Sequence, residues 1–495
     1  MNISSQALVA SNRQAHLTGT SRQADVESKA TFKLPLWVWL IAAALAIWGS
    51  YSANPLLTPA AIAVLVISMQ LLWRSGEPPV LVFACGMQWL QASAVILYID
   101  FYKIPLAMAG GSQEFETATW LSLIAVLVLA IGARLALIRS RRSQHATLVA
   151  SALRVNITNA FFAYLISFVI ATVVERTAFA VPQVTQLIYA LITLKWVAVF
   201  IVAYATIEQR SGYIFLVAIM CIEVTVGVLG FFSGFKSVFF LVLVVAMTSP
   251  LALRGRRLAI TLVCALALFF FGVVWSAIKA EYREFLNQGS GEQVVAVSVE
   301  DSATKFSDLV GSLTWENFID GFESMILRVG YTDYFARTIA NVPNHVPYEH
   351  GALWLGALEH IVTPRLLFPE KATISDSERT TLYTGVDVGG AKEGTSIGIG
   401  YIAESYVDFG PVFMFTPIFL LGVFYGLIYR AFVIRSNGKL IPAAIASSIL
   451  IFGAYTIETS NIKIVGGIMT QLLVIGTIYL LFGRAFKTWL EHGLK

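Results

Sequence analysis

The chain has 495 residues, of which 57% are hydrophobic and only 13% are charged, and its formal net charge is +4. This charged share is about half that of a typical soluble domain, so the composition excludes an ordinary water-soluble protein. Apolar runs of 18 or more residues recur along the chain, and each can cross roughly 30 Å of hydrocarbon as a helix. The alternating segments of an outer-membrane barrel are absent. The sequence therefore predicts an all-α protein that crosses a membrane many times.

The chain begins with a polar tail, residues 1–33, which is rich in Ser, Gln and Ala and is expected to be disordered. This tail lacks the apolar centre of a cleaved signal peptide, so the first apolar run is expected to stay as an anchor. Twelve spans are expected at residues 34–53, 57–73, 79–99, 118–138, 157–174, 185–207, 212–231, 236–252, 258–278, 410–432, 440–457 and 464–483. Nine spans thus fill residues 34–278, three fill residues 410–483, and residues 484–495 form a second tail.

Positive charge gathers in the loops that follow even-numbered spans. These loops hold Arg74, Arg139, Arg141, Arg142, Arg154, Arg210, Arg254, Arg256, Arg257, Arg430, Arg435 and Lys439, and Arg484 and Lys487 follow span twelve. Short positive loops face the cytoplasm, so twelve spans place both termini on the cytoplasmic side of the membrane. The same count places the one long loop, residues 279–409, on the outer side. We call this segment the outer loop.

The outer loop holds more than half of the acidic residues of the chain and three of its six histidines. Its residues 306–330 have apolar side chains at helical spacing, which predicts one helix ended by Gly330. Residues 331–342 and 351–362 predict two shorter helices, the second stopped by Pro364. Loops this long are usually functional or disordered. The periodicity favours a compact helical cap that lies on the outer face of the bundle.

The cations of the outer loop are candidates for an anion site. They are Arg328, Arg337, Arg365, Lys371, Arg379 and Lys392. Pro364 fixes the backbone just before Arg365, and Pro369 and Lys371 follow within six residues. A rigid turn that presents arginine and lysine near a membrane surface suits a phosphate or pyrophosphate. The alternative is that these cations pair with nearby acids or with lipid headgroups.

The end of the outer loop contains candidates for a general base. Residues 385–410 carry seven glycines. Glu404, Tyr406 and Asp408 lie near the end of this stretch, where the chain re-enters the membrane. A carboxylate at that boundary can have a raised pKa and accept a proton, although Glu404 can equally be hydrated in a flexible loop. His360 is the second candidate, with a surface or packing role as its alternative. The glycines match no nucleotide-binding motif, and the histidines and cysteines match no metal motif, so no cofactor and no metal are expected.

Two charged residues lie in the middle of predicted spans. Lys195 precedes the turn near residues 207–212 by about 12 residues, and Glu223 follows it by about 11. At a rise of about 1.5 Å per residue, both lie at the same depth on adjacent antiparallel helices. Charges at that depth need partners, so the spacing predicts a Lys195–Glu223 ion pair. A structural role is favoured, with a proton path as the alternative.

A family resemblance rests on three adjoining stretches: TPRLLFPEKATISDSERT at residues 363–380, EGTSIGIGYIAESYVDFG at residues 393–410 and PVFMFTPIFLLG at residues 411–422. Together with the topology, they resemble the Wzy-type O-antigen and exopolysaccharide polymerases. These families often show Pro-Arg-x-hydrophobic-x-Pro-x-Lys in the last large periplasmic loop, then a Gly/Thr/Ser stretch, then an acid-aromatic-x-x-Phe-Gly re-entry. Ala372 stands here where the families usually have a second proline.

The resemblance implies a GT-C-like membrane fold and oligosaccharide repeat units on undecaprenyl pyrophosphate as the substrate. It implies no nucleic-acid partner, and it implies a place in the bacterial inner membrane beside a flippase and a chain-length regulator. Fixed positive charge would stabilise the pyrophosphate leaving group. For this role we expect Arg365 first, then Lys371 and Arg379, with Arg328 as a second clamp and Arg337 and Tyr406 as substrate contacts. Glu404, or His360, would take the proton of the acceptor hydroxyl.

Two other functions remain open at this point. An O-antigen ligase would use the same donor but transfer the glycan to lipid A core. A transporter or flippase for lipid-linked sugars would instead place its polar residues along the interior of the bundle. The polar residues of this chain concentrate in the outer loop, apart from Lys195 and Glu223, which favours an enzyme.

Overall fold

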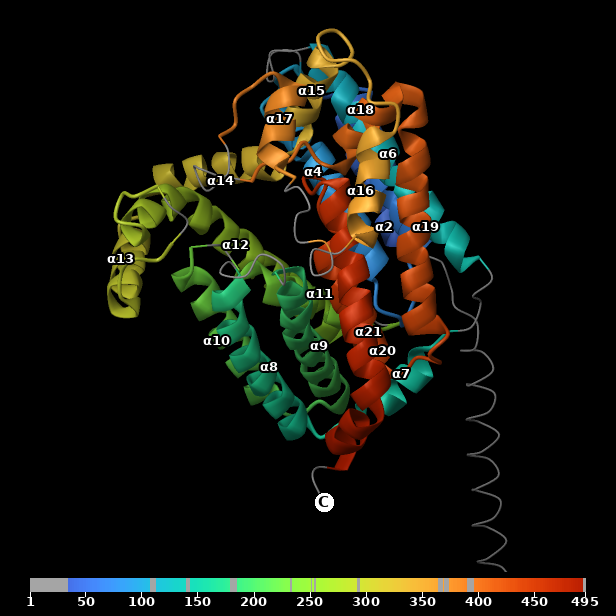
Figure 1. Cartoon of the computed structure of the whole chain (residues 1–495), viewed down its shortest axis with the longest axis vertical. Coiled ribbons are helices and arrows are strands. Elements are labelled where there is room, and N and C mark those ends of the chain that lie inside the picture. Colours follow the sequence, from blue (N-terminus) through green and yellow to red (C-terminus); the bar gives the residue numbers. More distant parts are fainter. Residues whose placement is uncertain are drawn as a thin grey trace, which may run out of the picture.

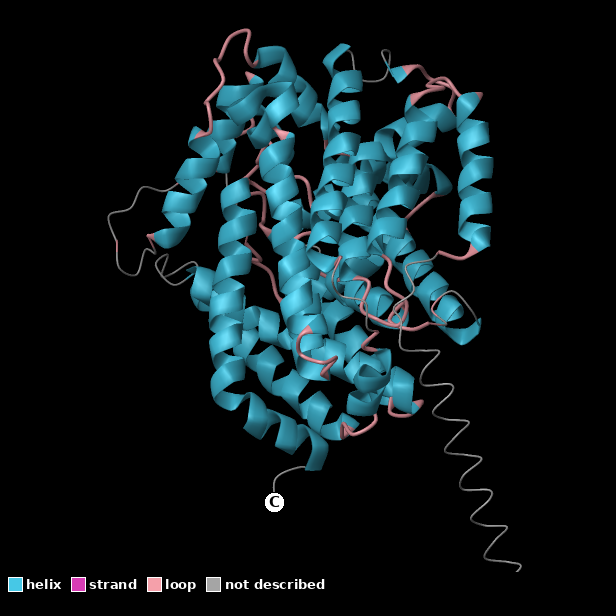
Figure 2. Cartoon of the chain, turned by 90° about the vertical axis from the view of Figure 1, so that its right-hand side faces the viewer, coloured by secondary structure: helices cyan, strands magenta, loops and turns pink. Residues whose placement is uncertain are grey.

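The computed structural model describes residues 34–106, 113–138, 143–178, 185–231, 234–250, 252, 255–291, 294–363, 368, 374–389 and 396–492. Helices make up 78% of the structure and the described residues contain no strand, as expected for the all-α class. Figure 2 shows these helices joined by loops throughout. The predicted tail at residues 1–33 lies outside the described residues.

Most of the helices form a bundle, and the helices of the outer loop lie along its upper and left-hand sides in Figure 1. The bundle contains α2 (Leu36–Ser50), α3 (Leu57–Leu72), α4 (Val80–Phe101), α6 (Gln113–Leu137), α7 (His145–Ala152), α8 (Ile157–Ala178), α9 (Thr185–Gln209), α10 (Tyr213–Leu229), α11 (Lys236–Ala246), α12 (Gly255–Leu286), α18 (Tyr401–Phe413), α19 (Phe415–Tyr429), the π-helix η2 (Arg430–Ile434), α20 (Leu440–Gly453) and α21 (Asn461–His492). The outer loop forms α13 (Val299–Gly311), α14 (Trp315–Val329), α15 (Thr332–Asn341), α16 (Ala352–Val362) and α17 (Asp376–Thr384).

Seven helices are long and apolar enough to cross a membrane. They cover Val80–Phe101, Glu114–Leu137, Ile157–Glu175, Gln186–Gln209, Arg257–Leu286, Phe415–Ile434 and Asn461–His492. The other five predicted spans coincide with shorter apolar helices: α2, α3, α10, α11 and α20. Among these five, the largest difference is at α11, which has 11 residues where 236–252 was predicted. At about 1.5 Å per residue it is roughly half as long as the hydrocarbon core is thick.

The centre of the bundle is packed through small residues. A Cβ atom on Gly422 would lie 2.2 Å from the Leu129 carbonyl oxygen, and one on Gly426 would lie 2.5 Å from the Ala133 carbonyl oxygen. The GxxxG spacing of these two glycines places both on one face of α19, so the backbones of α19 and α6 approach closely. In contrast, α21 and α12 expose large apolar side chains, as Leu480 (83% exposed) and Leu266 (67% exposed) illustrate. Faces of this kind suit contact with lipid tails.

The helices of the outer loop pack on the bundle, and we call them the cap. Helix α14 crosses α12, where the Phe322 ring lies 5.8 Å from Phe269. Helix α15 contacts α6, and α16 contacts α21. The single helix predicted for residues 306–330 is wrong, because the chain forms α13 and α14 with a break between them. The break follows from a capping box in which the Thr314 hydroxyl accepts from the Asn317 amide and the Asn317 side chain accepts from the Thr314 amide.

Candidate functional site

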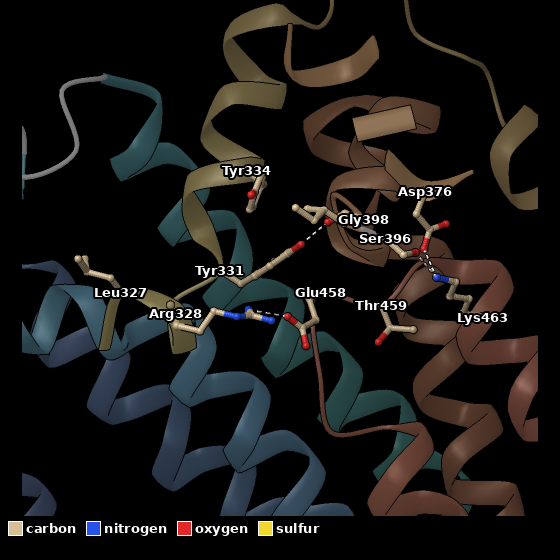
Figure 3. A pocket seen from close by; sticks show the side chains of 12 residues that line it. Leu327, Arg328, Tyr331, Tyr334, Asp376, Ser396, Gly398, Glu458, Thr459 and Lys463 are labelled. Atoms are coloured by element: carbon tan, nitrogen blue, oxygen red, sulfur yellow. Dashed lines mark hydrogen bonds and ion pairs between the residues drawn. The ribbon is translucent and has the colours of Figure 1, made fainter. Parts of the chain in front are cut away.

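A cavity of about 500 Å³ lies between the cap and the outer ends of the bundle helices. Three parts of the chain line it: the α14–α15 junction, the start of α17 with the loop before α18, and the connection from α20 to α21. Figure 3 shows charged side chains from all three parts, which form two ion pairs at the cavity. The volume falls in the range of roughly 300–1,000 Å³ that is common for small-molecule sites.

Arg328, a residue of the last turn of α14, forms an ion pair with Glu458 from the α20–α21 connection. The Arg328 Nη1 atom lies 2.9 Å from Glu458 Oε2, and Figure 3 shows the pair beside the cavity. The Arg328 side chain is 61% exposed and the Glu458 side chain is 30% exposed. An exposed pair of this kind is weak in water, so the guanidinium can exchange its partner for an incoming anion at a small cost.

Two more cations lie near Arg328. Lys279 and Arg283 come from the outer end of α12, and both lie within electrostatic range of the Arg328 guanidinium. Arg283 donates from Nε to the Phe231 carbonyl oxygen at 3.2 Å. Among the described residues, Glu458 is the only carboxylate that forms an ion pair with any of these three cations. We call Lys279, Arg283 and Arg328 the cation cluster. It carries an excess of positive charge that an anion with two negative charges would neutralise.

The opposite side of the cavity contains a second ion pair. Lys463 Nζ lies 2.7 Å from Asp376 Oδ2 and 2.9 Å from the Ser396 hydroxyl. The Asp376 side chain is 4% exposed, and Asp376 Oδ1 accepts no hydrogen bond from the described residues. The residue Asp376 lines the cavity, and its buried Oδ1 is an acceptor that lacks a donor within the described chain.

Aromatic rings lie between the two ion pairs. Tyr331 and Tyr334 both line the cavity, and their ring centroids are 5.3 Å apart. The Tyr331 hydroxyl donates to the Gly398 carbonyl oxygen, which ties the start of α15 to the loop before α18 (Figure 3). Tyrosine rings with one polar end suit ligands that combine apolar faces with hydroxyl groups, as sugars do.

Glu404, the base that the sequence predicts, lies behind this wall and does not line the cavity. Its side chain is 2% exposed; Oε2 accepts from the Asn461 amide at 2.7 Å, and Oε1 lies 3.4 Å from Arg379 Nη1. Burial raises the pKa of Glu404 to about 7, against the opposing effects of the Asn461 amide and Arg379. Asn461 is the first residue of α21, the helix that carries Lys463. Glu404 therefore fixes the start of α21 beside the cavity and acts as a positioning residue.

The raised pKa of Glu404 predicts a pH dependence of stability. The folded pKa of about 7 lies above the ordinary value of 4.5. The contribution of Glu404 to the free energy of unfolding is therefore fully present below pH 4.5 and is lost as pH rises through 7. The loss amounts to about 3 kcal/mol. We expect the thermal unfolding midpoint of the detergent-solubilised protein to fall between pH 5 and pH 8, and to fall much less in Glu404→Gln. The exposed Glu359→Gln is the matched control; an unchanged slope in Glu404→Gln would contradict the assignment.

The other predicted site residues are placed as follows. Tyr406 is buried, and its hydroxyl donates to the Val342 carbonyl oxygen at 3.2 Å, so the geometry favours a packing role. Arg337 pairs with Asp333 at 2.8 Å on α15 and does not line the cavity. His360 lies half-buried on α16, also away from the cavity. Arg365, Lys371 and Lys392 lie outside the described residues.

Asp408 supports the cap from the start of the re-entering chain. Its carboxylate accepts from the backbone amides of Leu353 at 3.0 Å and Trp354 at 2.8 Å, at the start of α16. Burial raises the pKa of Asp408, while these amides act in the opposite direction. The acid therefore caps α16 and favours a structural role.

Lys195 and Glu223 form the ion pair that their spacing predicts. Lys195 Nζ lies 2.9 Å from Glu223 Oε2, and the Tyr164 hydroxyl donates to Glu223 Oε1 at 2.9 Å. Lys195 Nζ also lies 4.4 Å from the centre of the Trp196 ring. Each charged group thus has partners within the bundle, as charges at that depth require.

Sequence reasoning did not single out the charged cavity residues Asp376, Glu458 and Lys463. It also missed Lys279 and Arg283, which lie near Arg328 without lining the cavity. Glu458 and Lys463 lie in the connection between the last two predicted spans. The twelve spans predicted from the sequence put that connection on the same side as the outer loop. The polar residues in this short connection could therefore have predicted that it shares a site with the outer loop.

A family model described as a domain of unknown function, DUF8712, matches residues 105–459. This match covers most of the chain, including the cap and most of the residues that line the cavity. No curated protein and no solved structure matches the chain.

Proposed function

We propose that this chain, which belongs to the DUF8712 family, extends a surface polysaccharide at the outer face of the bacterial inner membrane. Its substrate would be oligosaccharide repeat units carried on undecaprenyl pyrophosphate. In this proposal the twelve apolar segments predicted from the sequence cross the membrane in a GT-C-like arrangement, and α11 is the shortest helix among them. Both termini are cytoplasmic, because the even-numbered loops carry the arginine and lysine residues.

One observation carries the proposal: the cation cluster lies beside a cavity that also presents a buried carboxylate. Within the described chain, Arg328 pairs with Glu458 and neither Lys279 nor Arg283 forms an ion pair, so a diphosphate group would balance the charge of the cluster. Tyr331 and Tyr334 occupy the space between the cluster and Asp376, where the sugar next to the diphosphate would lie. The cluster sits at the end of α12, whose exposed apolar face can guide a lipid tail.

We propose a glycosyl transfer in which the cation cluster and Asp376 take part. The acceptor hydroxyl oxygen attacks the anomeric carbon of the donor glycan, and a new carbon–oxygen bond forms. The bond from that carbon to the pyrophosphate oxygen breaks, and its electron pair leaves with the lipid pyrophosphate. The cation cluster stabilises the charge that develops on this leaving group. The hydroxyl proton passes to the carboxylate of Asp376, the residue that lines the cavity. The energy comes from the carrier bond, so no nucleotide is required.

The residues predicted from the sequence keep their place in this proposal where the geometry allows. Arg365 and Lys371 lie outside the described residues, and their expected role at the leaving group stays a prediction from the sequence. Arg379 supports Glu404, and Glu404 supports the start of α21. Asp376 replaces Glu404 as the proposed proton acceptor because it lines the cavity and Glu404 does not.

The direct test is to incubate the purified protein with lipid-linked repeat units and to separate the products by length. We expect chains of many repeats on the lipid carrier, without nucleotide or metal added. Adding lipid A core as a competing acceptor separates polymerase from ligase, because a polymerase leaves it unmodified. A flippase would move the lipid-linked unit across a vesicle bilayer without lengthening it, and this result would overturn the proposal.

A further inference from the structure

A second concave site lies at the end of the bundle opposite the cap, close to the C-terminus in Figure 1. It is formed between the α7–α8 connection, the start of α20 and the last turns of α21. Its apolar wall includes Val155, Ile441 and Leu490. The Leu490 carbonyl oxygen accepts from the Asn156 amide at 2.8 Å, so the end of α21 is fixed against the start of α8. We call this site the basal groove.

Two lysines line the basal groove beside this apolar wall. Lys439 precedes the first turn of α20 and is exposed, and within the described chain its ammonium group has no hydrogen bond or ion pair. Lys487 is 53% exposed, and its Nζ lies 3.7 Å from Glu491 Oε1. A long, exposed pair between neighbouring turns of one helix contributes little, so Lys487 can bind another anion.

The size and surroundings of the basal groove narrow the choice of occupant. The groove holds about 60 Å³, well below the roughly 300–1,000 Å³ of sites that enclose a soluble small molecule. The neighbouring residues of α21 are apolar and exposed, with Leu480 at 83%, Leu481 at 70% and Phe482 at 61%. An occupant would therefore have an anionic head beside the lysines and an apolar part that continues along α21.

The geometry points to a binding site for an anionic phospholipid, with its phosphate between Lys439 and Lys487. One acyl chain begins against Ile441 and Tyr479 and continues along the exposed face of α21. Basic pockets at the cytoplasmic ends of membrane helices bind such headgroups, and each lysine near the surface contributes about 1 kcal/mol. The bound lipid would join α20, α21 and the α7–α8 connection. This inference does not depend on the proposed enzymatic activity.

The test measures retained lipid by native mass spectrometry of the full chain in a neutral detergent. Phosphatidylglycerol is the anionic probe, and phosphatidylcholine with the same acyl chains is the zwitterionic control. We expect the wild-type protein to retain one phosphatidylglycerol at low molar excess and to release it at high salt. The double variant Lys439→Gln, Lys487→Gln should need at least about tenfold more lipid for the same occupancy.

The matched control is Arg484→Gln, which removes an exposed cation three residues before Lys487 on α21 but outside the groove. Its occupancy should equal that of the wild-type protein. An equal loss in Arg484→Gln would mean that general surface charge attracts the lipid, and the groove would be rejected. Equal retention of phosphatidylcholine, or no retained lipid, would overturn the inference as well. Circular dichroism of each variant should show unchanged helix content.

Discussion

Replacing Arg328 with alanine is expected to reduce chain extension about 100-fold or more, and products should collapse to single repeat units. The guanidinium is the member of the cation cluster that lines the cavity, so its loss removes charge stabilisation where the diphosphate departs. The fold should persist, because the Arg328 side chain is 61% exposed and its removal relieves repulsion with Lys279 and Arg283. The measurement is the length distribution of lipid-linked products at equal amounts of membrane protein.

The cap provides a matched control for this variant. Arg337 is also half-exposed and also pairs with an acid at 2.8 Å, but it lies outside the cavity. Arg337→Ala should therefore leave the chain lengths unchanged. Arg328→Lys should restore part of the activity, since it keeps the charge and loses the fork of the guanidinium. Long chains from Arg328→Ala, or an equal loss in Arg337→Ala, would show that the cavity is not the site of transfer.

The helices of the bundle were predictable because lipid-spanning segments must be long and apolar. Each of the twelve predicted spans coincides with a helix, and the Lys195–Glu223 pair follows from spacing alone. The predicted helix boundaries are wrong where local hydrogen bonds determine the start of a helix. Residues 306–330 keep an apolar period through Ser312 and Leu313, but the capping box at Thr314 starts a new helix. The spacing of apolar residues indicates which face of a helix is buried. It does not indicate where a side chain accepts a hydrogen bond from a backbone amide and so starts a new helix.

The candidate site was only partly predictable, because it joins residues that are far apart in the sequence. Arg328 and Glu458 are 130 positions apart and meet only after α14 has packed across α12. Glu404 was predictable as an acid with a raised pKa, since it precedes an apolar span. Its distance from the cavity was not predictable, because that depends on how α18 and the start of α21 pack against each other. Asp376 looked like one of several acids in a polar stretch until the fold paired it with Lys463.

Asp376→Asn is expected to lower turnover about 100-fold or more while the protein still binds the lipid-linked donor. The carboxylate is the proposed acceptor of the hydroxyl proton, and an amide of the same shape cannot take that proton. The fold should tolerate the change, because Lys463 is 47% exposed and keeps its 2.9 Å contact with Ser396. Single-turnover measurements at saturating donor separate the loss of turnover from a loss of binding.

Two further variants decide whether Asp376 acts in the chemistry or only holds Lys463. Lys463→Gln removes the ion pair but keeps the carboxylate, so a purely structural role predicts that it matches the loss in Asp376→Asn. A role in proton transfer predicts instead that Lys463→Gln retains most of the turnover and that Asp376→Glu restores part of it. Asp333→Asn, a surface acid on α15 outside the cavity, should behave as the wild-type protein does. Equal losses in Lys463→Gln and Asp376→Asn would show that Asp376 has a structural role at the cavity. Another group would then have to accept the proton.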